Sequence, residues 1–282
     1  MKLLLGADPE FWLTKAGENV SAHGMVEGTK ENPLLLKNGA VQVDGTALEF
    51  NINPAENEEQ FVEHIDTVIE QIRTMIPKDY DFDFSPVAHY TEEVFKEIPK
   101  EAKILGCEPD YNAYTGLINE TPNVEATFRT AAGHVHFGYT DGVNVTNANH
   151  FKDCRSLIAY VDLFVGLPLS ILERTNKRNE LYGKAGAFRP KSYGVEWRTG
   201  SNFWLNSEKL QRLVYKQCQK AFSSLVNNDL LANRYTNYVN VRGYIDNIYG
   251  QNRIDIDNNR KHVMNSNRIL YEEELLYMCG II

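Results

Sequence analysis

The sequence has few cysteines and no long uninterrupted hydrophobic run. Its four cysteines are far apart and form no CxxC pair, which suits neither a zinc ribbon nor a disulfide framework. They indicate reduced thiols. The apolar run at the N-terminus ends at Asp8, too early for a signal peptide, and no segment approaches the ~18 apolar residues of a membrane span. We therefore expect a cytoplasmic protein with no membrane contact.

Several familiar catalytic signatures are also missing. The chain has no Walker A P-loop, no dinucleotide-binding glycine motif, no GxSxG elbow and no HExxH pair. Cys107 is more typical of a small buried hydrophobe than of a nucleophile. The net charge of −9 argues against general nucleic-acid binding and against attachment to an anionic membrane. The chemistry has to come from other residues.

What is present fits one globular domain. Hydrophobic residues make up 43% and charged residues 24% of the 282 positions, so a sizeable core can form. Apolar residues at helical spacing predict helices over 57–76, over 149–172 and after Asn206. The second of these should kink or divide near Pro168. We predict a single catalytic domain over 1–282, with the motifs within 1–206 and a helical or irregular C-terminal part over 207–282, which includes a short closing helix from Tyr271 to Met278.

Four segments alternate polar and apolar residues, as strands do. They cover 2–5 with 9–13, 41–53, 124–138 and 193–204. Helices lie between groups of strands and do not follow each strand. This order favours an α+β fold with an antiparallel or mixed sheet covered by helices on one face. The polar half of each strand would then line the open face.

Ionisable residues two apart share one face of a strand. Asp8 with Glu10, His134 with His136, and Glu196 with Arg198 have this spacing, and Glu49 lies on a fourth strand. Asp44 is an odd number of residues from Glu49, so a bulge at Gly45 would be needed to bring both to one side. Each segment also has a simpler interpretation. Asp8-Pro9 can be a turn, and the Glu49 segment can be a half-solvated strand. The two histidines can be packed or on the surface, and Glu196 with Arg198 can form an ion-pair ladder. Together they indicate one polar site.

The residue types favour a hard divalent cation and a phosphate. Carboxylate oxygens suit Mg²⁺ or Mn²⁺, and Mg²⁺ usually works together with substrate phosphates. Phosphates need cationic partners, and residues 172–198 carry seven Lys or Arg against three Glu, a net of +4. Within this segment the Gly183-Lys184-Ala185-Gly186 stretch predicts a flexible, phosphate-contacting loop. A solvated basic loop is the alternative.

The order of these motifs resembles the phage-associated carboxylate–amine ligases (COOH-NH2 ligase type 2), relatives of glutamate–cysteine ligase in the glutamine-synthetase-like superfamily. The resemblance covers roughly residues 1–206 and lies in five short motifs, which are Gly6-Ala7-Asp8-Pro9-Glu10-Phe11, Val43-Asp44-Gly45 with Leu48-Glu49-Phe50-Asn51, Gly106-Cys107-Glu108-Pro109-Asp110-Tyr111, Gly133-His134-Val135-His136-Phe137-Gly138, and Arg189-Pro190 with Tyr193 to Thr199.

The resemblance implies a curved, mostly antiparallel sheet of the glutamine-synthetase-like catalytic fold, with ATP and two or three Mg²⁺ ions. The metal ligands carried over are Glu10, Asp44, Glu49, His136 (or His134) and Glu196. Arg198 and Arg189 would meet the transferring phosphate, with Arg129 a further candidate, and Asp110 is a candidate for binding the amine. Asp8 stands where glutamate–cysteine ligases commonly have Glu, so it is not carried over as a ligand.

The function implied is an ATP- and Mg²⁺-dependent ligase that joins a carboxylate to an amine through an acyl phosphate. A metal-dependent hydrolase or phosphotransferase at the same site, or a non-enzymatic phage binding protein, are the alternatives. The partners expected are small-molecule or peptide acids and amines, and a phage-encoded protein would act in the host cytoplasm. The sequence identifies neither substrate, nor the general base, nor the oligomeric state.

Overall fold

The computed structural model describes residues 2–103, 110–120, 128–173, 177–228, 263–265, 268–270, 276–277 and 280–282. The chain divides into two compact units, each assembled from segments that are separate in the sequence. The first comprises residues 1–109, 120–139 and 201–212, and the second comprises 110–119, 140–200 and 213–282. One catalytic domain over 1–282 remains a prediction.

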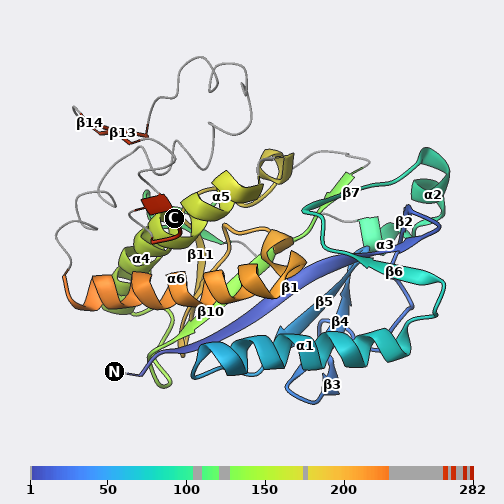
Figure 1. The fold of residues 1–282 in the computed structure, drawn as a ribbon, viewed down its shortest axis with the longest axis horizontal. Coiled ribbons are helices and arrows are strands. Elements are labelled where there is room, and N and C mark those ends of the chain that lie inside the picture. Colours follow the sequence, from blue (N-terminus) through green and yellow to red (C-terminus); the bar gives the residue numbers. More distant parts are fainter. Residues whose placement is uncertain are drawn as a thin grey trace. The chain divides into compact units, whose positions relative to one another are not determined.

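The first unit is built on an antiparallel sheet with β1 (Leu4–Lys15) near its centre (Figure 1). β5 pairs with one edge of β1 and β10 with the other, and every pair in this sheet is antiparallel. The strands run in the order β3 (Leu34–Leu36), β4 (Gly39–Asp44), β5 (Ala47–Ile52), β1 and β10 (Gly133–Gly138), and β2 (Glu18–Val20) and β6 (Tyr80–Asp83) also pair with β1.

β1 runs without a break through Asp8-Pro9, although the sequence predicts two strands there. The backbone N–H of Glu10 donates to the carbonyl of Ala132, the residue just before β10. This N–H therefore points to the side of β1 that pairs with β10. The nitrogen of Pro9 therefore points to the opposite side, where the ladder with β5 covers only Glu10 and Phe11. A proline is tolerated where no ladder hydrogen bond is needed. The turn interpretation of Asp8-Pro9 is wrong.

The predicted strand over 41–53 is a hairpin. β4 and β5 meet at a two-residue turn, with Asp44 opposite Ala47 and a left-handed φ of 59° at Gly45. A positive φ at the first turn position is the geometry that favours glycine in tight hairpins. The predicted bulge at Gly45 is therefore wrong, because the turn itself puts Asp44 and Glu49 on one side.

Helix α1 (Glu58–Met75) packs on β4 and β5 (Figure 1). The side chain of Asn57 caps its first turn by accepting from the N–H of Gln60, and it ends at Ile76 before Pro77. The predicted helix over 57–76 is confirmed. Its buried residues, with the apolar reverse sides of β1, β5 and β10, form the core of this unit: Phe61, Ile65, Val68, Ile72, Phe11, Phe50 and Phe137.

A smaller layer of the first unit packs around Trp12. β7 (Val87–His89) pairs with β9 (Phe128–Thr130), and α2 (Glu92–Glu97) and α3 (Lys100–Lys103) follow β7 in the chain. Trp12, Ala88, Tyr90, Ile98, Ala102 and Ala131 form its buried cluster. The predicted strand over 124–138 is thus β9 and β10 within the described residues, and 124–127 lie outside them.

The second unit carries β12 (Gly194–Trp197), β11 (Ala187–Lys191) and β8 (Tyr111–Asn112), paired antiparallel in that order. The 3₁₀ helix η3 (Asn202–Asn206) follows β12 in the chain and belongs to the first unit, so the predicted strand over 193–204 is half strand and half helix. η2 (Lys177–Glu180) precedes β11. A separate hairpin pairs β13 (Val263–Asn265) with β14 (Arg268–Leu270).

The predicted helix over 149–172 is divided into three parts. α4 (Ala148–Val161) leads into a π-helical turn, η1 (Asp162–Gly166), and then into α5 (Leu167–Glu173). The N–H of Leu167 bonds the carbonyl of Asp162, five residues back, just before Pro168, which has no N–H to give. The predicted division near Pro168 is confirmed.

The combined helix Ala148–Glu173 is the one segment of the described chain long and apolar enough to cross a membrane, contrary to the sequence-based expectation that none exists. Its most apolar window is 72% buried inside the protein, and α4 packs on β11 and β12. Burial of this kind is typical of a core helix.

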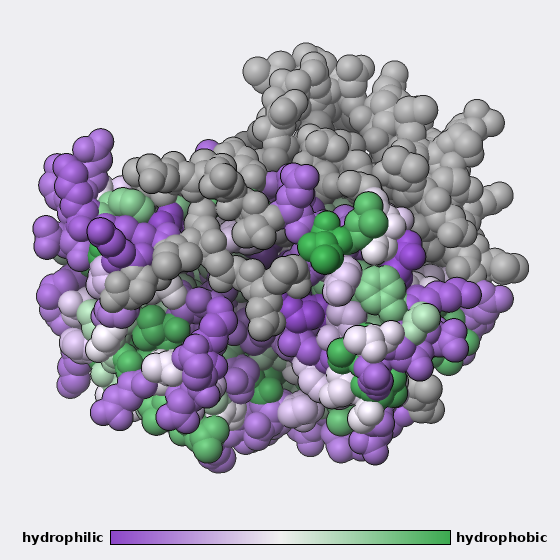
Figure 2. Space-filling view, turned by 180° about the vertical axis from the view of Figure 1, so that it is seen from behind, coloured by the Kyte–Doolittle hydropathy of each residue, from purple (hydrophilic) through white to green (hydrophobic). Residues whose placement is uncertain are grey.

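Helix α6 (Glu208–Val226) confirms the third predicted helix, with Val214, Cys218 and Ala221 buried. Cys154 and Cys218 are buried, and neither forms a disulfide among the described residues. Cys107, Cys279 and most of the predicted closing helix lie outside the described residues. In Figure 2 hydrophilic residues dominate the visible described surface, and hydrophobic residues form scattered groups.

The α+β fold class and the mostly antiparallel sheet are confirmed. In the first unit a helix covers one face of the sheet, as predicted. The polar side chains lie on the other.

Candidate functional site

Strand register gathers the acidic residues and histidines of the first unit on one face of its sheet. Asp8 stands opposite His134, and Glu10 stands opposite Glu49. Residues directly opposite each other in a sheet point to the same side, and so do residues two apart along one strand. Asp8, Glu10 and Glu49 therefore share one face with both histidines.

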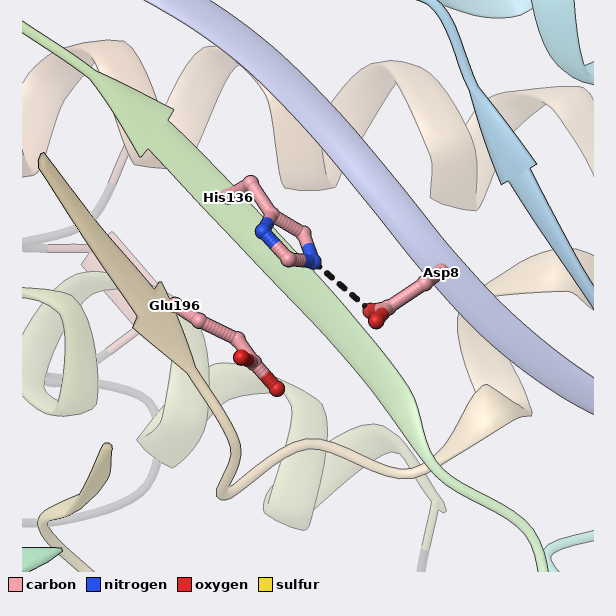
Figure 3. A group of neighbouring side chains, drawn as sticks. All are labelled: Asp8, His136 and Glu196. Carbon is pink, nitrogen blue, oxygen red and sulfur yellow. Dashed lines mark ion pairs between the residues drawn. The ribbon is translucent and has the colours of Figure 1, made fainter. Parts of the chain in front are cut away.

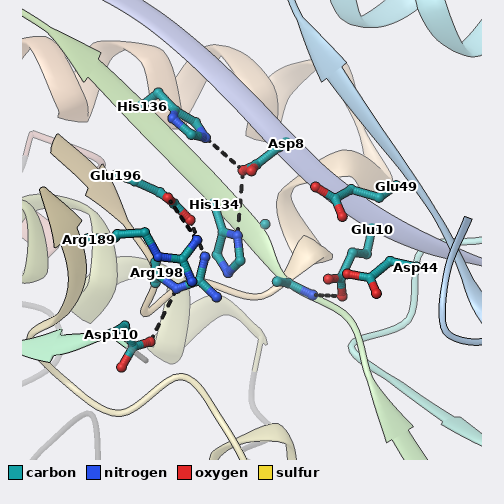
Figure 4. Close-up of polar contacts among 12 residues, drawn as sticks. Asp8, Glu10, Asp44, Glu49, Asp110, His134, His136, Arg189, Glu196 and Arg198 are labelled. Atoms are coloured by element: carbon teal, nitrogen blue, oxygen red, sulfur yellow. Dashed lines mark hydrogen bonds and ion pairs between the residues drawn. The ribbon is translucent and has the colours of Figure 1, made fainter. Parts of the chain in front are cut away.

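Glu10, Asp44 and Glu49 form a carboxylate triad. One oxygen of each lies within 4.8 Å of one oxygen of each of the others. The N–H of Ala132 donates to Glu10 Oε2 over 2.8 Å, and Gln42 Nε2 donates to Glu49 Oε2 over 3.1 Å. These bonds fix the orientation of two of the carboxylates. Half of the predicted metal ligands are thus brought together by three strands (Figure 4).

The charges in the triad repel one another. The pKa of the Glu49 carboxyl lies well above its usual range, because burial disfavours its charged form and because Asp8, Glu10 and Asp44 add negative charge nearby. Lys30 acts in the opposite direction, with its Nζ 3.1 Å from Asp44 Oδ2. A cluster of hard oxygen donors with excess negative charge fits Mg²⁺ or Mn²⁺.

Asp8 joins the two histidines. Its Oδ1 lies 2.9 Å from His136 Nε2 and 3.5 Å from His134 Nδ1, and Figure 3 shows the His136 ring directed at this carboxylate. Burial would raise the pKa of Asp8, but the charge of His136 and the close approach of both imidazoles outweigh it and hold that pKa well below its usual range. Asp8 therefore stays ionised between its two imidazole partners.

The second unit contains the reverse arrangement, one buried carboxylate among cations. The side chain of Glu196 is 1% exposed. Its oxygens lie 2.8 Å from Lys191 Nζ and 3.5 Å from Arg189 Nη1, and they also pair with Arg198. Arg198 Nε in turn lies 3.2 Å from Asp110 Oδ2 (Figure 4). The predicted phosphate-binding residues Arg189 and Arg198 are thus brought together around Glu196, which is itself a predicted metal ligand.

The Lys184 loop is anchored, contrary to the predicted flexibility. The carbonyl of Lys184 accepts from the N–H of Ala187 and from Thr199 Oγ1, each over 3.1 Å. Gly183 and Gly186 have φ of 72° and 79°, left-handed values that favour glycine. The Lys184 side chain is exposed, so the loop presents one ammonium group on a fixed backbone.

Two arginines have structural surroundings. Arg178, from the same basic segment, is buried and donates through Nη1 to the carbonyl of Thr199 over 2.7 Å. Arg129, predicted to be catalytic, is buried too and donates through Nη2 to the carbonyl of Lys103 over 2.7 Å, with its guanidinium over the ring of Phe95. These contacts stabilise the chain locally, and the catalytic role of Arg129 stays a prediction.

Asp162, in the π-helical turn, was not predicted to be a site residue. Its Oδ1 accepts from Trp197 Nε1 over 2.8 Å, and its Oδ2 accepts from Tyr114 Oη over 3.0 Å and from the N–H of Gly186 over 2.6 Å. Burial raises the pKa of Asp162 to about 6, although these donors work to lower it. Asp162 thus connects α4, β12 and the loop that carries Lys184.

Part of the chain matches the model of a known family. Residues 125–252 match the model of the phage phiEco32-like COOH.NH2 ligase-type 2 family. The resemblance inferred from the sequence motifs is confirmed. The matched range contains Gly133 to Gly138 and Arg189 to Thr199, two of the motifs on which that resemblance rests. No protein with a curated function matches the sequence.

Two solved structures are remotely similar. A bifunctional glutathione synthetase from Pasteurella multocida has 13% identity and a TM-score of 0.42, over 83% of this chain and 40% of its own. A glutamine synthase homologue has 13% identity and a TM-score of 0.38, over 80% of this chain and 56% of its own. The chain therefore spans about half the length of these proteins or less.

Sequence reasoning placed Asp8 on the polar face with Glu10 by their spacing, but did not carry it over as a metal ligand. It left Lys30 and Asp162 out altogether. Neither residue carries a signal of that kind. Lys30 lies in an irregular loop, and Asp162 is one polar residue in a helix that is otherwise apolar on its core side.

Proposed function

We propose that this protein is an ATP- and Mg²⁺-dependent (or Mn²⁺-dependent) carboxylate–amine ligase that forms an amide or peptide bond through an acyl phosphate. The observation that carries the proposal is the convergence of Glu10, Asp44 and Glu49, with ligand oxygens within 4.8 Å of one another, on the polar face of a sheet. The match to a COOH.NH2 ligase family over 125–252 supports the reaction class.

The residues of the first unit suit the metal. Glu10, Asp44 and Glu49 would hold a divalent ion, and His134 or His136, oriented by Asp8, would add an imidazole ligand. Such an ion neutralises the charge that develops on phosphate oxygens during transfer.

The residues of the second unit suit the phosphate. Arg189, Arg198 and Lys184 would bind the transferring phosphoryl group, and Glu196 keeps the first two arginines aligned through its ion pairs. An arginine held in one orientation loses less entropy when it binds a phosphate. A free carboxylate is a poor electrophile, so phosphorylation makes its carbon open to attack by an amine. The phosphate then leaves and the amide bond remains.

Product release tests the reaction. The purified protein, with Mg²⁺, ATP and a pooled set of amino acids and small peptides, should release ADP and phosphate only when an acid and an amine are both present. Hydroxylamine in place of the amine should trap the acyl phosphate as a hydroxamate. ADP release without any amine would indicate a hydrolase or phosphotransferase, and no thermal shift with Mg²⁺ and ATP would indicate a passive binding protein.

A pair of variants ties the reaction to the triad. Glu49→Gln removes one carboxylate of the triad and should abolish hydroxamate formation. Glu63→Gln makes the same chemical change at an exposed position of α1 and should leave it unchanged. Equal activity in both variants would remove the triad from the mechanism.

A further inference from the structure

Lys30 is held at the edge of the carboxylate triad by a short turn. Thr29 and Asn32 exchange backbone hydrogen bonds of 3.1 Å, and Thr29 Oγ1 accepts from the N–H of Asn32 over 3.2 Å. Lys30 stands at the tip of this turn. Its position is therefore determined by the backbone and not by its own flexible side chain alone.

The turn is attached to the strand that carries Asp44. The N–H of Val43 donates to the carbonyl of Gly28 over 3.0 Å. Gly28 lies so close to β4 that an added Cβ would be 2.0 Å from the carbonyl oxygen of Val41. This close approach requires glycine and places Lys30 two residues beyond an anchor on β4.

The ammonium of Lys30 pairs with one carboxylate oxygen of Asp44, a member of the triad. Its Nζ lies 3.1 Å from Asp44 Oδ2, and the Lys30 side chain is 53% exposed. A half-exposed ion pair of this kind contributes little to stability. A divalent cation carries twice the charge and binds carboxylate oxygens directly at short range.

We propose that Lys30 is a displaceable counter-ion of the carboxylate triad, which neutralises Asp44 in the metal-free protein and is expelled from it when a divalent metal ion binds. This inference rests on the proposed function, because it assigns the triad to a metal. Lys30 then lowers the metal affinity of the free enzyme, and it becomes available to an anionic substrate group only after metal has bound.

Metal binding without nucleotide tests the proposal. Binding of Mn²⁺ to the purified full chain is measured by electron paramagnetic resonance of the free ion, at pH 8 to limit competition by protons. Lys30→Gln should bind Mn²⁺ about 2- to 5-fold more tightly than the wild type, the factor that corresponds to an exposed ion pair of about 0.4 to 1 kcal/mol. Lys30→Arg keeps the charge and should stay near the wild type.

Lys37→Gln is the matched control. It removes the same charge from an exposed position next to the other end of β4, beyond Gly39, whereas Asp44 is the last residue of that strand. Six strand residues span roughly 17–20 Å, about twice the screening length at physiological salt. Its Mn²⁺ affinity should equal that of the wild type.

The outcomes separate this inference from the proposed function. If the wild type binds Mn²⁺ and Glu49→Gln does not, the metal site is supported. If Lys30→Gln then binds Mn²⁺ more tightly and Lys30→Arg and Lys37→Gln do not, the role of Lys30 as a counter-ion is supported. Unchanged or weaker binding in Lys30→Gln overturns the counter-ion and leaves the metal site standing. Absence of Mn²⁺ binding in the wild type overturns both.

Discussion

Negative side chains are in excess around the carboxylate triad of the first unit, and positive side chains are in excess around Glu196 in the second unit. Burial and the repulsion from neighbouring carboxylates raise the pKa of Glu49, and Lys30 offsets this only in part. Glu196, in contrast, pairs with Arg189, Lys191 and Arg198. The first set of residues attracts a cation, and the second attracts an anion. The proposed ligands, Mg²⁺ and a nucleotide phosphate, would satisfy one set each.

Neutralising one triad carboxylate should stabilise the metal-free protein. In Glu49→Gln the like charge directly opposite Glu10 is removed, so the free energy of unfolding in EDTA should rise by roughly 0.5 to 1 kcal/mol. Denaturant unfolding at pH 8 measures this, with Glu63→Gln as the neutral control. A decrease would mean that Glu49 serves mainly to hold the fold through Gln42.

Removing the Glu196 charge should have the opposite effect. Glu196→Gln leaves a buried position facing Arg189, Lys191 and Arg198 without a compensating anion, which should lower the free energy of unfolding by about 3 kcal/mol. Added sulfate should restore more stability to this variant than to the wild type, as thermal unfolding will show. Asp153→Asn, an exposed change on α4, is the control. Equal sulfate effects would contradict this account.

Among the elements, the π-helical turn η1 has the clearest physical consequence. It places the Asp162 carboxylate inside the second unit, where it bonds Trp197, Tyr114 and the backbone of Gly186. One side chain thus joins a helix, a strand and the glycine loop before β11. Burial of this carboxyl group costs much less when it is protonated than when it is ionised.

Stability should therefore depend on pH through Asp162. Its pKa is about 6 in the folded protein and about 3.8 in the unfolded chain, so the native state binds more protons between these values. The contribution of Asp162 is fully present below pH 4 and falls by about 3 kcal/mol as the pH rises through 6. Denaturant unfolding from pH 4 to 7 should show this slope in the wild type and not in Asp162→Asn. If the free energy of unfolding changed with pH in the same way in both proteins, the pH dependence would not come from Asp162.

Elements that have a clear periodic pattern of apolar residues could be predicted from the sequence. Elements whose course depends on which strands pair with each other could not. The apolar stripe of Phe61, Ile65 and Ile72 and the cap at Asn57 define α1 from the sequence alone. The hairpin at Gly45 and the unbroken course of β1 through Pro9 depend on which strand lies beside which. Short strands such as β6 and β11 were missed for the same reason, because each has little pattern of its own.

At the scale of the whole molecule, the candidate residues were identified better than their roles. Glu10, Asp44 and Glu49 converge as expected. Alternation along the strands places Glu10 and Glu49 on a polar face, and the hairpin turn at Gly45 adds Asp44 to it. The ion pairs around Glu196 and the contacts of Arg129 depend on residues distant in sequence, such as Lys191 and Lys103. No local pattern could have shown them.

Ligands should stabilise the whole chain if the proposed function is right. The complex of Mg²⁺ with ATP, bound as one ligand at about 100 times its dissociation constant, should raise the free energy of unfolding by about 2.7 kcal/mol, and EDTA should reverse this. Thermal unfolding with ATP alone, Mg²⁺ alone and both together measures the effect. An ATP effect that persists in EDTA would contradict a metal-dependent nucleotide site.

The pairing of β1 has a consequence for how the protein can evolve. Asp8 and Glu10 alternate with Ala7 and Phe11 along one strand, and the same hydrogen bonds position both sets. A slip of one residue would send the acids into the apolar interior and the apolar residues into solvent. Insertions or deletions within this strand should therefore destroy the proposed activity and folding together, whereas substitutions on its polar side can alter that activity alone.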